Sequence, residues 1–429
     1  MASLLINAVP CALALLVLGC GTSGGTDHHA AAGSAGAQPS AGGVGGATGS
    51  SGAGGSSTAG GSTLGGAGAG GSSSGGTAGR STGASGGMSG DGGASATMGG
   101  KAGMAAGDAG TAGSGAGGLA GTGGAGGDAG DPLRGTPVEK GIALLPADRQ
   151  EHGVVAAHGE VYVLGGYSPD VTPSVIAYDP AKDSWRSVKD FPSPFNHPAA
   201  GVIDDKIYVA GFYAGTSLTG PATGRTFVYD PAADTWTEKK ALPDGTERAG
   251  GCVTALGTDL YVFGGGNSGE ATDFASVYDS VADTWTELPK LPETREHCSA
   301  YVSGGKIYIC GGRTHTIPEF RPSTLEFDPE AKTYEQKTPI PTPRGGAAGA
   351  VLYGRLFLFG GEGADNQDGV FPDIQSYDGA TDTWESYPPM LVPRHGYGGG
   401  TVGDKIYLMG GAIRQGGAAS DVATVFYFK

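Results

Sequence analysis

Short runs of consecutive apolar residues, each closed by a pair of glycines, recur through the C-terminal two-thirds of the chain. They are rich in β-branched and aromatic residues, as in the segments 161–164, 306–309 and 405–408. Such a composition is typical of β-strands. Because neighbouring positions are both apolar, and do not alternate with polar ones, both faces of each strand should be covered. The pattern therefore predicts a series of short, buried strands.

The glycine pairs define a repeat. They are Gly165-Gly166, the degenerate Ala210-Gly211, Gly264-Gly265, Gly311-Gly312, Gly360-Gly361 and Gly410-Gly411. Successive pairs lie about 45 to 54 residues apart. At this period each unit is one supersecondary element, which cannot bury its own faces and must pack against its neighbours.

Two further features return at fixed places in the unit. An aromatic residue followed by aspartate comes about 13 to 19 residues after each of the first five glycine pairs, and a second aromatic residue follows seven positions later. The first set is Tyr178, Tyr229, Tyr278, Phe327 and Tyr377, and the second is Trp185, Trp236, Trp285, Tyr334 and Trp384. A Leu-Pro-like turn and usually an arginine complete the unit.

On these motifs the region from about 137 to 429 resembles the kelch-repeat family. The resemblance implies an all-β fold, a β-propeller with one four-stranded blade per repeat. Six glycine pairs then predict a six-bladed kelch propeller, which we assign to residues 136–429.

The order of the parts predicts how the ring closes. The last repeat reaches its third strand at residues 423–427, and no fourth strand follows. The segment from Pro137 to Leu145 ends in Leu145-Pro146 and Arg149, as each fourth strand does where it leads into the next blade. We therefore expect this N-terminal strand to complete the last blade, which would remove an exposed sheet edge.

Residues 21–135 have a different composition. Residues 21–130 contain 44 glycines, and no Phe, Trp or Tyr precedes Tyr162. Such a segment buries too little apolar surface to offset its chain entropy, so we predict a disordered tether. The matches to G-x-S-x-G and G-x-G-x-x-G in residues 21–87 fall in it, without the strand and helix that such turns require.

Residues 1–20 predict a lipoprotein signal peptide. An apolar stretch ends in Val17-Leu18-Gly19-Cys20, which resembles a bacterial lipobox with Cys20 as the lipidated residue. The stretch is too short for a membrane span. We expect an exported, lipid-anchored protein, with the outer membrane or cell surface as its location, because glycine follows Cys20.

Net charge restricts the partners. The whole chain carries −16, and leaving out the two basic and four acidic residues of 21–130 leaves −14 on the propeller region. This field opposes binding to nucleic acid and to anionic membrane surfaces.

Three cysteines remain in that region, and Cys298 and Cys310 lie symmetrically about the turn at 303–305, so either a hairpin disulfide or free thiols fit.

Positions that differ between blades are the candidate ligand site. In peptide-binding kelch propellers, the resemblance places such positions before the first strand and after the glycine pair, around a shallow bowl. The bowl here would contain Arg149, Gln150, Tyr167, His197, Phe212, Tyr213, Arg248, Asn267, Arg295, Glu296, Arg313, Arg344, Glu362, Arg394 and His395. The arginines among them suggest an acidic ligand, because guanidinium groups bind planar anions through two hydrogen bonds, although they could equally bond to blade backbone. Blade two, with a degenerate glycine pair, no arginine and the longest loop, should depart most from the symmetry.

No catalytic, metal or cofactor motif emerges from the sequence. The favoured function is a non-catalytic interaction module, displayed at the cell surface, that recognises a protein segment or a polysaccharide. The alternative is a carbohydrate-active enzyme, since kelch-like propellers include galactose oxidases and sialic-acid epimerases. An oxidase would draw on Cys252, Cys298, His297 and His315, and an epimerase on His197, Glu296, His297 and His395 as acid and base groups.

Overall fold

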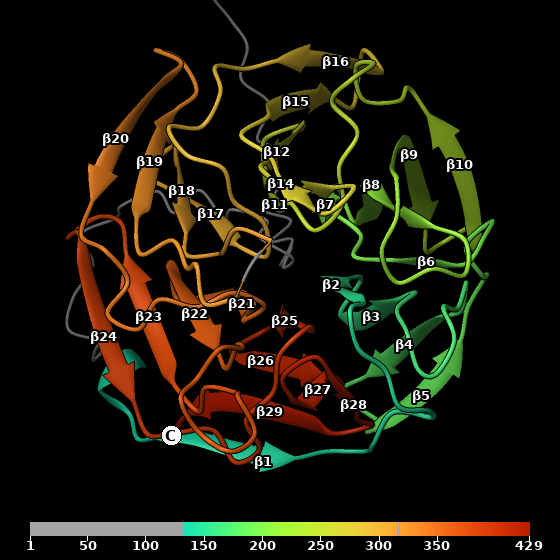
Figure 1. Cartoon of the computed structure of the whole chain (residues 1–429). Helices are drawn as coiled ribbons and strands as arrows, with labels where there is room; N and C mark the ends of the chain where they lie inside the picture. Colours follow the sequence, from blue (N-terminus) through green and yellow to red (C-terminus); the bar gives the residue numbers. More distant parts are fainter. Residues whose placement is uncertain (1–131, 316) are drawn as a thin grey trace, which may run out of the picture. The chain divides into compact units, whose positions relative to one another are not determined.

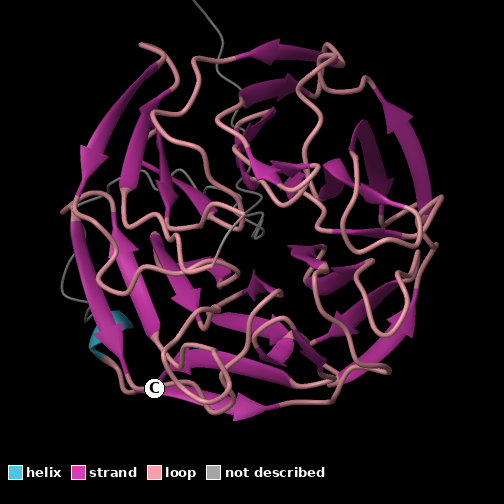
Figure 2. Ribbon diagram, viewed as in Figure 1, coloured by secondary structure: helices cyan, strands magenta, loops and turns pink. Residues whose placement is uncertain are grey.

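The computed structural model describes residues 132–315 and 317–429, and these form a ring of six antiparallel sheets (Figures 1 and 2). The predicted all-β, six-bladed propeller is confirmed. Within the described residues the helical structure is limited to a short 3-10 turn, η1 (Pro132–Arg134). The predicted signal peptide, the lipidation site Cys20 and most of the predicted tether fall on residues 1–131, outside the described residues.

Each blade runs outward from an innermost strand that lines the centre of the ring (Figure 1). Blade 1 consists of β2 (Gly153–Ala157), β3 (Glu160–Leu164), β4 (Val175–Asp179) and β5 (Ser184–Ser187). Blade 2 consists of β7 (Ala200–Ile203), β8 (Lys206–Ala214), β9 (Ala222–Asp230) and β10 (Thr235–Lys239), with β6 (Phe195–Asn196) paired to β8. Blade 3 consists of β11 (Cys252–Leu256), β12 (Asp259–Phe263), β15 (Ala275–Asp279) and β16 (Thr284–Glu287).

The remaining three blades follow the same order. Blade 4 consists of β17 (Ser299–Ser303), β18 (Lys306–Cys310), β19 (Thr324–Asp328) and β20 (Thr333–Lys337). Blade 5 consists of β21 (Ala348–Leu352), β22 (Arg355–Phe359), β23 (Ile374–Asp378) and β24 (Thr383–Tyr387). Blade 6 consists of β25 (Gly398–Val402), β26 (Lys405–Met409), β29 (Ala423–Phe428) and β1 (Pro137–Gly141). Two small hairpins extend the loops of blades 3 and 6, formed by β13 (Gly266–Asn267) with β14 (Glu270–Ala271) and β27 (Ala412–Arg414) with β28 (Gly417–Ala419).

The ring closes as the sequence predicts. Strand β1 pairs antiparallel with β29, in register from Pro137 opposite Phe428 to Gly141 opposite Thr424. The two ends of the described chain therefore share blade 6, and no blade is left with three strands.

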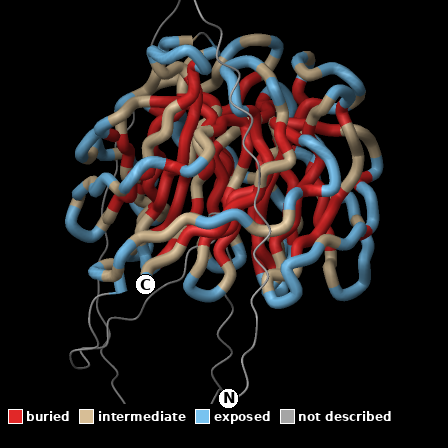
Figure 3. The backbone as a smooth tube through the Cα atoms, turned by 90° about the horizontal axis from the view of Figure 1, so that it is seen from below, coloured by how far each residue is buried: buried red, intermediate tan, exposed pale blue. Residues whose placement is uncertain are grey.

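Apolar side chains fill the six spaces between neighbouring blades. Each of six hydrophobic clusters draws its buried residues from two adjacent blades, including the pair formed by blades 6 and 1. The buried residues form the interior, and the exposed ones lie in the turns at the two ends of the strands and along the outermost strands (Figure 3). This explains why the strands are apolar on successive positions, since each face of a blade meets another blade.

The repeated tryptophan and a nearby aspartate form a contact that we call the outer clamp. In blade 2, Trp236 Nε1 donates to the carbonyl of Lys189 at 3.0 Å, and Asp234 Oδ1 accepts from the Lys189 N–H at 2.7 Å. Tyr229 Oη donates to the same carboxylate oxygen at 2.5 Å. The backbone N–H and carbonyl of Lys189, which lies between blades 1 and 2, are thus both hydrogen-bonded by side chains of blade 2. Blades 1, 3 and 5 repeat the contact on Ala143, Lys240 and Thr338.

Blade 4 has a reduced clamp for a physical reason. The residue between blades 3 and 4 at the clamp position is Pro289, which has no N–H to donate. Correspondingly, Lys332 stands in the place of the aspartate and Phe327 in the place of the tyrosine. Only the carbonyl contact remains, from Tyr334 Oη to Pro289 O at 2.7 Å.

The glycine pairs join each blade to the next one. In blade 3 the Gly265 N–H donates to the carbonyl of Arg295, in blade 4, at 2.8 Å, and in blade 6 the Gly411 N–H donates to Arg149, in blade 1, at 2.7 Å. At Gly264 a Cβ atom would collide with that same carbonyl of Arg295. The first glycine is therefore required by close backbone approach, and the strand-ending role predicted for the pairs is confirmed.

Blade 2 departs from the pattern as expected. Strand β8 continues past Gly211, with an irregularity in register between Ala210 and Phe212, and pairs with β9 as far as Tyr213 opposite Ala222.

Among the described residues, no helix is long and apolar enough to cross a membrane.

Candidate functional site

At one end of the central channel the six blades present equivalent residues, which we call the mouth ring. Each lies two positions after the repeated arginine, or after Phe195 in blade 2, and has a left-handed backbone with φ between 50° and 67°. The mouth ring consists of Glu151, His197, Gly250, His297, Gly346 and Gly396. Each N–H donates to the carbonyl of the ring residue in the preceding blade, at 2.6 to 3.2 Å, so the hydrogen bonds form a closed circle.

Three members of the mouth ring carry side chains, although glycine suits their backbone best. A left-handed conformation costs a non-glycine residue on the order of 1 kcal/mol. The three side chains converge: His197 Nε2 lies 3.1 Å and His297 Nε2 lies 3.5 Å from Glu151 Oε2. Their exposed fractions are only 9 to 12%. The mouth therefore holds a compact, mostly buried group of two imidazoles and one carboxylate.

A second layer of charged residues surrounds this group. Glu296 Oε1 lies 3.5 Å from His297 Nδ1 and 3.3 Å from Arg313 Nε. Arg313 Nη1 bonds to Glu362 Oε1 at 2.6 Å, and Glu362 Oε2 lies 3.6 Å from His395 Nδ1. With the three mouth-ring side chains, these four residues form what we call the mouth network, in which acidic and basic groups alternate.

Burial and mutual charge set the protonation of the network. Burial lowers the pKa of His197 to about 4, and Glu151 only partly opposes this effect. Burial also disfavours charge on His297, but Glu296 and Glu151 outweigh it and raise the pKa of His297 to about 9. Burial acts against the Glu151 carboxylate too, yet the neighbouring histidines hold its pKa well below the usual range. Of the two histidines that face Glu151, His297 therefore carries the positive charge.

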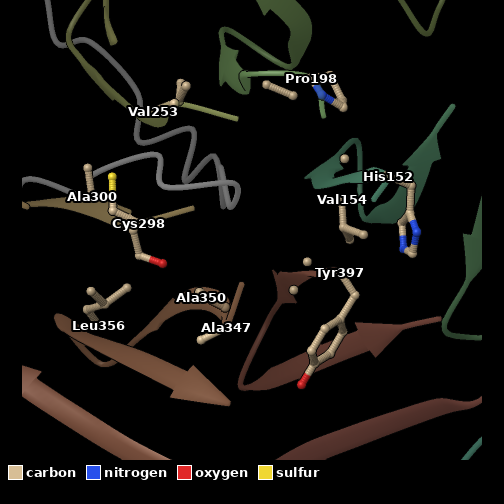
Figure 4. Close-up of a pocket in the computed structure, with 17 residues that line it drawn as sticks. His152, Val154, Pro198, Val253, Cys298, Ala300, Ala347, Ala350, Leu356 and Tyr397 are labelled. Atoms are coloured by element: carbon tan, nitrogen blue, oxygen red, sulfur yellow. The ribbon is translucent and has the colours of Figure 1, made fainter. Parts of the chain in front are cut away.

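The mouth opens into the channel. A cavity of about 120 Å³ is lined by all six mouth-ring residues together with His152, Pro198, Gly251, Cys298, Ala347 and Tyr397. A second cavity of about 150 Å³ shares some of these residues and adds small apolar ones such as Ala300, Ala350 and Gly399 (Figure 4). The polar groups therefore stand above a narrow channel whose walls are mainly small and apolar.

The predicted arginine ring does not face this site, and the expectation of guanidinium groups open to a ligand is corrected. Arg149, Arg248, Arg295, Arg344 and Arg394 are 0 to 6% exposed. Their guanidinium groups bond within their own blades, as when Arg394 Nη1 donates to Val422 O at 2.7 Å and Arg344 Nη1 donates to Gln375 Oε1 at 2.6 Å. The side chains turn inward because strand-end carbonyls of the blade need donors.

The other predicted bowl residues divide into two groups. His197, Glu296, Arg313, Glu362 and His395 meet in the mouth network, and Tyr213 packs on His197 with ring centroids 5.3 Å apart. Phe212 is fully buried in the core, Gln150 pairs through its backbone with Tyr167, and Asn267 bonds to the Glu247 carbonyl at 3.1 Å. These last four belong to the core or the loops, and of all ten residues only His197 lines the cavity.

Glu151 is not among the residues predicted from the sequence, and His297 is named there only for the two enzyme alternatives. The signal that finds both is the alignment of the repeats on the arginine, because the position two residues later is glycine in three blades and Glu or His in the other three. All four acid-base candidates of the epimerase alternative, His197, Glu296, His297 and His395, do lie in the mouth network.

The cysteine pairing differs from the hairpin bridge considered in the sequence. Cys252 and Cys298 form a disulfide between blades 3 and 4, with Cα atoms 5.2 Å apart, and Cys310 is free and buried. Across the hairpin Cys310 faces Ser299, one residue beyond Cys298, so the two thiols are out of register. Cys252 and Cys298 are thus not free for the cross-link that a radical oxidase requires.

Family models match most of the ring. Residues 219–411 match the KLHDC2/KLHL20/DRC7 Kelch-repeats domain, and residues 148–192 match the Kelch motif. The sequence is 32% identical to Kelch-like protein terF of Aspergillus terreus over 245 residues, which is 53% of each chain. It is 28% identical to Beta-scruin of Limulus polyphemus over 233 residues, 50% of this chain and 25% of that protein. The chain therefore spans about half of the length of terF and a quarter of the length of Beta-scruin.

A solved structure with a similar fold is the one titled "Structure of YjhT". The match has a TM-score of 0.56 and 17% sequence identity, and it covers 66% of this chain and 96% of that one. At this identity the likeness supports the propeller fold alone.

The repeated motifs, the blade geometry and the family matches agree, and they show that the chain belongs to the kelch-repeat family.

Proposed function

We propose that this protein is a non-catalytic binding module, displayed at the surface of a bacterial cell, that takes a segment of another protein at the mouth of its channel. Kelch propellers are typically protein-interaction modules. The observation that carries the proposal is the mouth network, in which different polar side chains converge on a framework that otherwise repeats from blade to blade.

The loops on the mouth side support this choice of surface. The extended pair β8 and β9 and the two small hairpins, β13 with β14 and β27 with β28, all follow glycine-pair positions and so stand at the mouth end. They differ in length and sequence between blades. Variable loops on a regular scaffold are where binding specificity usually resides.

The ligand need not be acidic. An acidic ligand would require exposed guanidinium groups in the arginine ring, and these side chains are buried. Arg313 at the mouth already bonds to Glu362 and lies beside Glu296. We therefore propose recognition by the shape and hydrogen bonding of the mouth, with a protein segment in preference to a polysaccharide.

A peptide display library screened against the purified full chain tests the proposal. Peptides selected by the wild-type protein should lose at least tenfold in affinity with Arg313→Ala. The control Lys182→Ala lies in the exposed turn between β4 and β5, at the opposite end of the strands, and should bind normally. The proposal fails if no peptide is selected while an array of polysaccharides yields a ligand, or if both variants bind alike.

Export and anchoring form the second part of the proposal. The disulfide between Cys252 and Cys298 supports an oxidising compartment, where such bonds persist. Metabolic labelling with a fatty acid analogue should mark the wild type and leave Cys20→Ser unlabelled. Protease treatment of intact cells should digest the propeller of an anchored protein. Equal labelling of both forms would refute lipidation at Cys20, and full protection from protease would refute surface display.

A further inference from the structure

We propose that Glu151, His197 and His297 form a binding site for one divalent transition metal ion at the mouth of the channel. This site is separate from the proposed protein binding. It also differs from the prediction made from the sequence, in which no metal motif is visible. Within the described residues, these three make up the one group of at least three His, Cys, Asp or Glu side chains whose donor atoms all lie within 4.8 Å of one another.

The spacing of the donor atoms suits such an ion. Metal to ligand bonds of about 2.0 to 2.2 Å place neighbouring donors about 3.3 Å apart in a tetrahedral site. The distances from Glu151 Oε2 to His197 Nε2 and to His297 Nε2 are 3.1 and 3.5 Å. Two imidazoles with one carboxylate favour Zn²⁺ or a neighbouring transition metal over Ca²⁺ and Mg²⁺, which prefer oxygen ligands alone.

The outer nitrogens of both histidines face oxygen atoms of the kind that orient ligating imidazoles. His197 Nδ1 lies 2.5 Å from Asn196 Oδ1, which leaves Nε2 to point at Glu151. His297 Nδ1 lies 3.5 Å from Glu296 Oε1, and Arg313 in turn stands beside that carboxylate. Such outer partners fix the tautomer and orientation of metal-binding histidines.

His297 gives independent support for a ligand at this group. Its side chain is 9% exposed, and Nε2, which lies 3.5 Å from Glu151 Oε2, forms no hydrogen bond. A buried polar atom without a partner is costly, so each such case calls for an explanation. A metal ion on Nε2 satisfies this nitrogen, and the cavity of about 120 Å³ beside it leaves space for a water or a ligand atom in the open coordination position.

The backbone supports the same conclusion. Glu151, His197 and His297 hold left-handed conformations that glycine occupies in the other three blades. The closed circle of backbone hydrogen bonds fixes all six positions. A rigid ring that carries donor side chains only where they converge is the kind of support that a metal site requires.

Zinc binding by the purified full chain, stripped with EDTA, tests the proposal. Isothermal titration should show one Zn²⁺ per chain in the wild type and none in the triple variant Glu151→Gly, His197→Gly, His297→Gly. Glycine is the natural residue of the other blades at this position, so the variant retains the backbone. Histidines elsewhere, such as the exposed His158 and His315, are unchanged in it, and the control His158→Gly, also at positive φ, should bind zinc normally.

Two further measurements make each outcome decisive. Zn²⁺ should raise the melting temperature of the wild type and not that of the triple variant, because ligand binding stabilises only the form that binds. Glu296→Gln should weaken binding about tenfold, as changes to outer partners do. Equal zinc stoichiometry in wild type and triple variant, or no site in the wild type, would overturn the proposal. Peptide binding measured in EDTA tests the proposed function separately.

Discussion

The outer clamp and the mouth ring show how differently two parts of one repeat can behave. The outer clamp recurs with the same atoms in four blades, and where Pro289 removes one donor the partner residues change with it. The mouth ring repeats its backbone in all six blades, but its side chains are Glu, His, Gly, His, Gly and Gly. Framework residues can thus be identified because they repeat from blade to blade. Residues of the candidate site can be identified because they differ between blades at an otherwise repeated position.

Breaking the disulfide should have the largest effect on stability. The double variant Cys252→Ser, Cys298→Ser should lose about 4 kcal/mol of the free energy of unfolding, because the bond closes a loop with a sequence separation of 46. Urea denaturation measures the loss. A reducing agent should destabilise the wild type and leave the double variant unchanged. A loss below 1 kcal/mol would show that the bond does not join blades 3 and 4 in solution.

Removing an arginine below the mouth tests whether it belongs to the framework. Arg344→Met should lose about 3 kcal/mol, because the carbonyl of Thr342 and the amide of Gln375 would be left buried without their donor. The exposed Arg225, replaced in the same way, should change stability by less than about 0.5 kcal/mol. Intact stability in Arg344→Met would return the arginines to the list of ligand-binding candidates.

The outer clamp should contribute less per residue. Asp234→Ala should lose about 2 kcal/mol, since Tyr229 Oη and the Lys189 N–H both lose their acceptor. Chemical denaturation of this variant beside Asp244→Ala, which changes an exposed loop residue, isolates the effect. Equal stability of the two variants would contradict the role of the clamp.

A mouth-ring side chain should contribute little to stability despite its burial. His197→Gly should stay within about 1 kcal/mol of the wild type in EDTA, because relief of the left-handed backbone offsets the lost contacts with Glu151 and Tyr213. Thermal and urea denaturation together measure this. A loss above 3 kcal/mol would place His197 in the framework and blur the distinction between the two regions.

The smallest effect is expected where the clamp is already reduced. Lys332→Asp restores the aspartate of the repeat, yet it should change stability by less than about 0.5 kcal/mol, because Pro289 offers no N–H and Phe327 no hydroxyl. A gain near 2 kcal/mol in urea denaturation would mean that the carboxylate alone stabilises the turn.

The repeated motifs predicted nearly all of the fold. Glycine pairs, the aromatic-Asp pairs and the tryptophans gave the number of blades, and the missing fourth strand gave the closure through β1. Such features are legible because they depend on local backbone geometry and on neighbours at a fixed sequence distance. The candidate site was predicted only in part, with His197, Glu296, Arg313, Glu362 and His395 found and Glu151 missed.

The sequence by itself determined that six blades form, that they close into a ring, and that blade 2 differs from the rest. Only the tertiary structure decided where side chains point once the ring is closed. Arg344 and its equivalents turn into their blades because buried carbonyls require donors. Cys298 bonds to Cys252 of the neighbouring blade, because Cys310 faces Ser299 across the hairpin and is out of register with Cys298. Glu151, His197 and His297, far apart in the chain, meet because ring closure places equivalent positions around one channel.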